Sequence, residues 1–250
     1  MRKRDLLLAT FGLLAVWQIA ALLVDRTILP PPVAVLAALV RETASGSLTG
    51  HFLASLWRVT ASTILAIATA APVGLVLGQS RRLNALFSPI IYLLYPIPKV
   101  VFVPVVLLFL GIGDASKIAV IFMILFFQIL VLVRDQAAGL RPELIRSVRS
   151  LGAGRMALFR FVYLPASIPG ILTALRQSVG TAVAVLYIAE LFATQQGLGY
   201  YIYLNGSALF NYPAMYAGVI AMSILGLGLY FAVDGLERVL CPWQTDAQKR

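Results

Sequence analysis

Long apolar runs recur along this 250-residue chain and limit what it can fold into. Hydrophobic residues make up 60% of the sequence, and charged residues only 12%. A helix rises about 1.5 Å per residue, so about 20 apolar residues cross a hydrocarbon core of about 30 Å. The runs predict an all-α membrane protein with one transmembrane domain over residues 1–250. Six spans are expected, at about 6–24, 59–78, 86–110, 118–133, 169–189 and 213–233.

Two of these runs need comment. The first follows Met1-Arg2-Lys3-Arg4, as in a signal peptide, but it ends in Asp25-Arg26 without a small-residue cleavage site, so a retained span is expected. The third contains Pro96, Pro98 and Pro104, and prolines break helices. It should therefore be broken or strongly kinked. Between the first two spans, residues 46–50 are expected to form a loop.

The basic residues are spread unevenly between the two sides that six spans define. With the N-terminus inside, the inner segments carry 14 lysines and arginines and the outer segments four. The positive-inside rule then predicts that both termini and the segment 134–165, which holds six arginines, are cytoplasmic. The net charge of +10 is dispersed among apolar runs, so nucleic acid is not an expected partner.

The segment 134–165, called the window below, is the one long polar stretch between spans. Pro142 suits the first turn of a helix and Gly152 its end, and a second helix is expected from about Arg155 to Val162, stopped at the membrane by Leu164-Pro165. Apolar residues of the first helix share one face: Leu144, Ile145, Val148 and Leu151. Such a pair of helices either lies on the anionic leaflet or inserts its apolar ridge into a groove of a soluble partner.

The window resembles the cytoplasmic signature of importer-type ATP-binding-cassette (ABC) permeases. That signature is a Glu-Ala-Ala triplet, three residues, a glycine, nine residues, an isoleucine, one residue and Leu-Pro. Gly152, Val162 and Leu164-Pro165 stand at the family spacing, with valine in the isoleucine position. The triplet is replaced by Arg146, Ser147 and Val148, so the glutamate that would contact the ATPase is missing.

The resemblance extends over almost the whole chain and is closest to the nitrate, sulfonate and taurine group of permeases. Further segments that carry it, in order, are 29–33 (LPPPV), 55–59 (SLWRV), 95–99 (YPIPK), 111–113 (GIG), 164–172 (LPASIPGIL), Glu190 and 197–200 (GLGY). The resemblance implies a type I importer permease in a bacterial inner membrane.

By that resemblance, two permease copies would form the path for a small anion such as nitrate, taurine or an alkanesulfonate. A cytoplasmic ABC ATPase would supply energy, and an extracytoplasmic binding protein would deliver the solute. The chain has no phosphate-binding loop, so neither an enzymatic activity nor a cofactor is expected. The ATPase-coupling residues implied are Leu144, Arg146, Val148, Leu151, Gly152, Ala153, Phe159, Leu164 and Pro165.

Three charged residues are candidates for the translocation path. Lys99 and Arg176 lie within predicted spans, where a cation would attract an anion; alternatively, Lys99 serves carbonyls freed by the prolines and Arg176 reaches back to the inner surface. Glu190 is either a gate or docking contact, or the point where its helix reaches water. One histidine and one cysteine offer no metal site.

Other functions are less well supported by the residues. An ion-coupled secondary transporter would need intramembrane carboxylates or an inverted repeat, and no predicted span has a central acid. A membrane-embedded enzyme would need a nucleophile with a base, or metal ligands. A vitamin precursor remains an alternative substrate for the same kind of permease.

Overall fold

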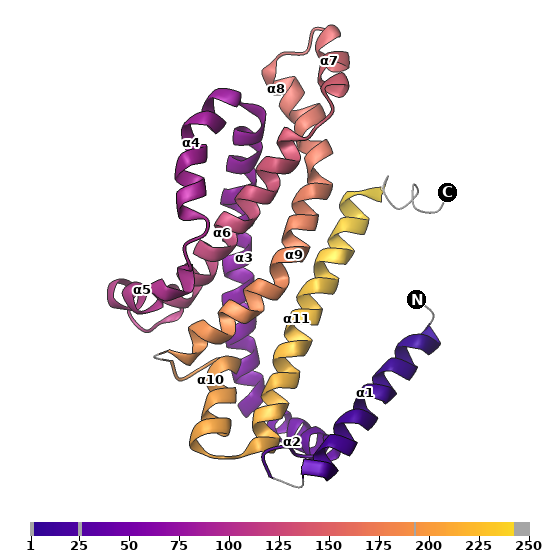
Figure 1. Ribbon diagram of the computed structural model, residues 1–250, viewed down its shortest axis with the longest axis vertical. Helices are drawn as coiled ribbons and strands as arrows, with labels where there is room; N and C mark the ends of the chain where they lie inside the picture. The colour runs from indigo at the N-terminus through magenta and orange to yellow at the C-terminus, as the bar shows by residue number, and fades with distance from the viewer. Residues whose placement is uncertain (1–2, 25–26, 193, 243–250) are drawn as a thin grey trace. The chain divides into compact units, whose positions relative to one another are not determined.

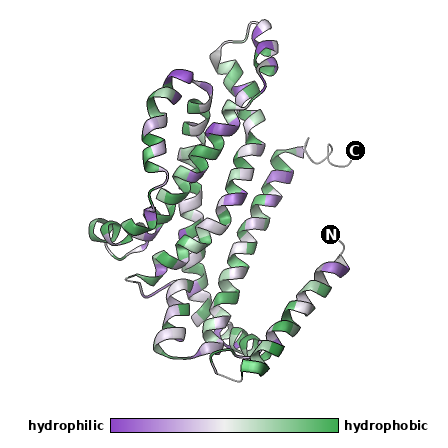
Figure 2. Ribbon diagram, viewed as in Figure 1, coloured by the Kyte–Doolittle hydropathy of each residue, from purple (hydrophilic) through white to green (hydrophobic). Residues whose placement is uncertain are grey.

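The computed structural model describes residues 3–24, 27–192 and 194–242, and over these residues it is helical without a strand (Figure 1). The all-α prediction is therefore confirmed. Four helical segments are long and apolar enough to cross a membrane: α3 (Ser47–Gln79), α6 (Asp114–Ala138), Met156–Leu191, which ends in α9 (Leu164–Leu191), and α11 (Tyr212–Leu240). In Figure 2 the green of hydrophobic residues recurs along the ribbons of these helices.

The fifth candidate span is the broken one that the prolines predicted. Helix α4 (Arg81–Leu94) is followed by the 3-10 helix η1 (Lys99–Phe102) and α5 (Val103–Leu110), and the chain turns by 73° between them. Pro96 and Pro98 lie in the break, where they remove two backbone donors. The expected interruption of span three is thus confirmed.

The first predicted span corresponds to α1 (Lys3–Val24). Its described apolar part, Leu8–Val24, has 17 residues and would cover about 25 Å at 1.5 Å per residue, slightly less than a hydrocarbon core. The described residues therefore give four spans, or five with the bent pair, and the sixth stays a prediction.

The second span begins earlier than expected. The short helix α2 (Pro32–Ala44) is followed by a turn at Gly46, whose φ of +81° favours glycine, and α3 starts at once at Ser47. The predicted loop at 46–50 is wrong, because only Ser45 and Gly46 separate the two helices. Pro72 lies within α3 without ending it.

Contacts divide the chain into two units, which we describe separately. The first comprises Met1–Leu56 and Glu190–Leu225, with α1, α2, α10 (Leu198–Tyr203) and the π-helix η3 (Leu204–Ala208). The second comprises Trp57–Ala189 and Gly226–Arg250. Within the second unit α3 packs tightly on α6: a Cβ atom added to Gly78 would lie 2.5 Å from the carbonyl oxygen of Arg134. The glycines at 74 and 78 thus let two helices approach closely.

Candidate functional site

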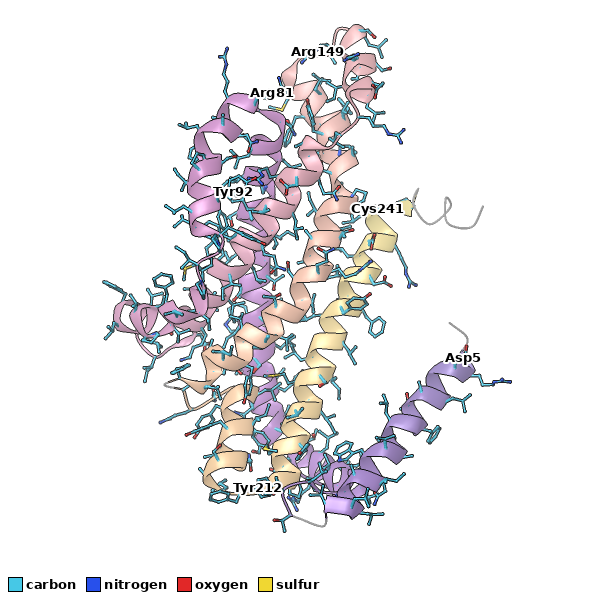
Figure 3. All side chains as sticks on the ribbon, in the orientation of Figure 1. Asp5, Arg81, Tyr92, Arg149, Tyr212 and Cys241 are labelled. Carbon is cyan, nitrogen blue, oxygen red and sulfur yellow. The ribbon has the colours of Figure 1, made fainter. Side chains whose placement is uncertain are left out.

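The window forms the predicted helix and glycine corner. Helix α7 (Pro142–Ser150) begins with proline and has Glu143 in its first turn. At its end the N–H of Gly152 donates to the carbonyl of Arg149 at 3.0 Å, and the φ of Gly152 is +80°. A glycine is needed there, since side chains disfavour this conformation. In Figure 1, α7 lies beyond the end of α6, and Figure 3 marks Arg149 on it.

The second window helix differs from the prediction. Helix α8 (Arg155–Leu158) passes into a π-helix, η2 (Phe159–Tyr163), which continues into α9. The predicted stop at Leu164-Pro165 is therefore wrong. The N–H of Leu164 donates to the carbonyl of Phe159, five residues back, which makes a wider turn than an α-helix. This π-helical turn comes directly before Pro165, whose nitrogen has no hydrogen to donate.

Several apolar side chains of the window are exposed within this chain. Leu144 is 49% exposed, Leu151 85% and Met156 77%. Among the other predicted coupling residues, Arg146, Gly152 and Leu164 are exposed, whereas Val148, Ala153, Phe159 and Pro165 are partly buried. Exposed large apolar residues beside arginines are typical of a protein-binding surface.

Lys99 has internal partners in the break between α4 and α5. It is 9% exposed, and its ammonium donates to the carbonyls of Leu94 (2.9 Å), Tyr95 (2.8 Å) and Ile97 (3.2 Å). An ammonium has three donors, so all are used. Its Nζ also lies 4.6 Å from the ring centroid of Phe127. This geometry favours the alternative in which Lys99 serves carbonyls freed by the prolines.

Arg176 joins α9 to α11. Its guanidinium forms ion pairs with Asp234, at 3.3 Å, and with Glu237. Asp234 also accepts from Arg238 at 2.6 Å. Arg176 is therefore held by two carboxylates of the neighbouring helix, a contact that the sequence did not reveal.

Glu190 is fully buried, so it is not the point where its helix reaches water. Its carboxylate accepts from the hydroxyl of Ser55, 2.8 Å from each oxygen, and from the N–H of Gly199 at 2.9 Å. Ser55 in turn accepts from the N–H of Leu198 at 2.8 Å. A carboxylate, a serine and a loop backbone thus form one buried network.

His51 extends this network, which we call the Glu190 cluster (His51, Ser55, Glu190 and residues 197–199). The N–H of Gly197 donates to Nδ1 of His51 at 3.0 Å. Gly197 has a φ of +121°, and a Cβ there would collide with the Glu190 carboxylate. The sequence singled out Glu190 and the segments 55–59 and 197–200 separately. It gave no sign that they meet, although a buried acid requires nearby donors.

Two more buried cations were missed. Arg58, which the charge count includes among the outer segments, lies in α3, is 3% exposed and donates from Nε to Asp114 of α6 at 2.8 Å. Lys117 is 2% exposed and donates to the carbonyl of Ile112. Within the described residues, no group of three or more His, Cys, Asp or Glu side chains is arranged to hold a metal ion.

Known proteins resemble this chain over most of its length. Residues 63–245 match the family described as the binding-protein-dependent transport system inner membrane component. The taurine transport system permease protein TauC of Escherichia coli (strain K12) is 32% identical, covering 93% of this chain and 86% of TauC. A putative aliphatic sulfonates transport permease protein, SsuC of Bacillus subtilis (strain 168), is 29% identical over 93% of this chain and 84% of its own length.

A solved structure shares the fold. A chain of the MetNI methionine ABC transporter, in inward-facing conformations, superposes with a TM-score of 0.69 at 23% identity, covering 77% of this chain and 95% of that one. This agreement confirms the type I importer permease fold. The family match over residues 63–245 and the relative at 32% identity lead to one assignment: the chain belongs to the family of binding-protein-dependent transport system inner membrane components.

Proposed function

We propose that this permease forms the path for a small organic or inorganic anion, taurine or another sulfonate first among them, in an ATP-driven importer. The observation that carries the proposal is the window, with its glycine corner at Gly152 and its exposed apolar residues. The names of the relatives support a sulfonate as substrate. The alternative substrate is a vitamin precursor carried by the same machinery.

The coupling step would take place at α7 and α8. Leu144, Val148 and Leu151 follow one another at helical spacing and would enter a groove of a cytoplasmic ATPase. Arg146 is exposed and stands where related permeases keep a glutamate, so the matching position of the ATPase should be acidic or neutral. Closure of the ATPase pair would then shift α6 and α9, which flank the window, as rigid elements. ATP hydrolysis itself belongs to the partner.

The topology that goes with this role places both termini and the window in the cytoplasm of a bacterial cell. The Glu190 cluster then lies at the extracytoplasmic end, where a binding protein docks. A second copy of the chain would complete the path. We propose that Lys99, Arg176 and Glu190 shape this path indirectly, because their charged groups are occupied by protein partners.

Reconstitution tests the proposal. The permease would be placed in vesicles with its cognate ATPase and binding protein, and uptake of labelled taurine would be measured with and without ATP. We expect uptake that requires ATP and the binding protein together. Uptake driven by an ion gradient without ATP would overturn the importer role in favour of a secondary transporter. ATP-driven uptake of a vitamin precursor, with none of taurine, would overturn the anion assignment alone.

A further inference from the structure

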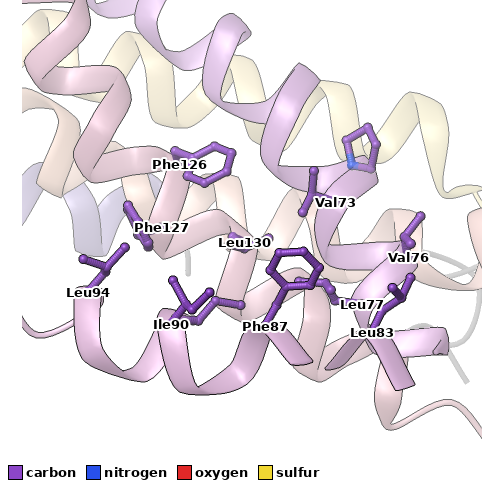
Figure 4. Close-up of a pocket in the computed structure, with 12 residues that line it drawn as sticks. Val73, Val76, Leu77, Leu83, Phe87, Ile90, Leu94, Phe126, Phe127 and Leu130 are labelled. Atoms are coloured by element: carbon purple, nitrogen blue, oxygen red, sulfur yellow. The ribbon is translucent and has the colours of Figure 1, made fainter. Parts of the chain in front are cut away.

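An apolar cavity of about 470 Å³ opens between α3, α4 and α6, all within the second unit. Figure 4 shows Phe87, Ile90 and Leu94 of α4 on one side, with Phe126 and Phe127 of α6 opposite them. Every residue that lines the cavity is apolar. Water gains no hydrogen bonds in such a space, and an anionic solute would lose its hydration without compensation.

The cavity has the length of one membrane leaflet. Along α4 it runs from Leu83 to Leu94, 11 residue steps or about 16 Å at about 1.5 Å per step, and half of a hydrocarbon core is about 15 Å. Its wall is open sideways, because Phe87 and Ile90 are 43% and 51% exposed. An extended acyl chain could therefore enter laterally from the bilayer.

Both ends of the cavity carry cations, but only those at one end are exposed. At the Leu94 end the chain bends into η1. The ammonium of Lys99 donates to the carbonyl of Leu94, so this carbonyl has a hydrogen-bond partner although the helix ends there. At the Leu83 end stand Arg81 and Arg82, both exposed. Figure 3 marks Arg81 at the start of α4, and Tyr92 lies near the other end of this helix.

We infer that the cavity binds one acyl chain of an anionic phospholipid, whose phosphate pairs with Arg81 and Arg82. The apolar walls select a hydrocarbon, the length selects a single leaflet, and the two cations select a negative headgroup. Under the proposed topology the lipid comes from the cytoplasmic leaflet. The lipid chain would fill the space beside α4, which is the first half of the broken span. It would thereby hold α4 against α3 and α6.

Quenching by brominated phospholipids tests this site. The full chain carrying Phe87→Trp would be reconstituted in vesicles of phosphatidylcholine and phosphatidylglycerol, with one or the other brominated, and the parent chain's tryptophan signal subtracted. We expect brominated phosphatidylglycerol to quench this tryptophan at least about fivefold more strongly than its mole fraction predicts. Each nearby cation favours an anionic lipid by about 1 kcal/mol, which is about a fivefold preference. Leu93→Trp, on an exposed part of the same helix, reports ordinary boundary lipid and should show no such preference.

Paired charge variants complete the test. Arg81→Gln with Arg82→Gln should abolish the preference at position 87, whereas Arg146→Gln with Arg149→Gln, which removes two exposed cations from the window, should leave it unchanged. Equal preference at positions 87 and 93 would overturn the site. So would a tryptophan at 87 that neither lipid quenches, which would indicate that a second copy of the chain covers the cavity. Circular dichroism and gel filtration confirm that each variant is folded.

Discussion

At the scale of single residues, the buried acid Glu190 is the clearest departure from an apolar interior. A carboxylate without partners would be expensive there, yet two donors face it: the hydroxyl of Ser55, whose one hydrogen is shared between both carboxylate oxygens, and the backbone N–H of Gly199. Gly197 leaves room for the carboxylate because it has no Cβ. The arrangement fixes the chain after α9 to the start of α3. The Glu190 carboxylate therefore holds in place the loop that follows α9.

Removing this carboxylate should destabilise the protein. Glu190→Ala leaves the Ser55 hydroxyl and the Gly199 N–H without an acceptor, and each buried unsatisfied group costs about 1–3 kcal/mol. Glu190→Gln keeps one acceptor oxygen and should cost clearly less. Unfolding by sodium dodecyl sulfate, followed by circular dichroism, measures the difference. Ser223→Ala is the matched control, because its exposed hydroxyl bonds only to its own helix; an equal loss in Ser223→Ala and Glu190→Ala would contradict the prediction.

At the scale of elements, the window is a corner whose parts have separate physical causes. Pro142 starts α7, Gly152 ends it in a left-handed conformation, and the π-helix η2 carries the chain past Pro165 into α9. Helix α8, which follows the corner, thus belongs to the same continuous helical segment as a span, Met156–Leu191. A displacement of the corner would be transmitted along α9 instead of being absorbed by a flexible linker.

The glycine corner gives a test with a matched pair of substitutions. Gly152 and Gly154 both face open space, but only Gly152 has a positive φ. Gly152→Ala should therefore strain the corner by about 1–2 kcal/mol, whereas Gly154→Ala should not. We expect solute-stimulated ATPase activity of the assembled importer to fall several-fold in Gly152→Ala and to stay near the parent level in Gly154→Ala. Equal activity in the two variants would remove the corner from the coupling step.

At the scale of the whole molecule, the sequence predicted what depends on local composition. Apolar runs located four long helices that can span the membrane, and Pro96 with Pro98 located the break in a fifth candidate, because both effects act within a few residues. The start of α3 was missed, since a helix continues through polar residues once a turn at Gly46 has been made. Contacts between distant residues were also missed. Ser55 and Glu190 are 135 positions apart, and no local pattern around either residue indicates that the two are in contact.

Charge counting predicts the orientation of the molecule in the membrane, and thiol chemistry can measure it. Cys241 is the only cysteine in the sequence and is buried, and burial raises the pKa of its thiol. The thiolate is the reactive form, so a raised pKa lowers the rate of alkylation at pH 7, and the rate should increase about tenfold per pH unit as the thiol ionises. The native chain is thus a nearly silent background for cysteines introduced elsewhere.

Two introduced cysteines then decide the topology. Ser150 lies at the exposed end of α7 in the window, and Thr49 is exposed in the first turn of α3. If 14 inner basic residues hold the window in the cytoplasm, a membrane-impermeant maleimide should label Thr49→Cys but not Ser150→Cys in intact cells. Inverted vesicles should give the opposite pattern, and detergent should expose both sites. Labelling of Ser150→Cys from outside would reverse the topology and place the window where no cytoplasmic ATPase could reach it.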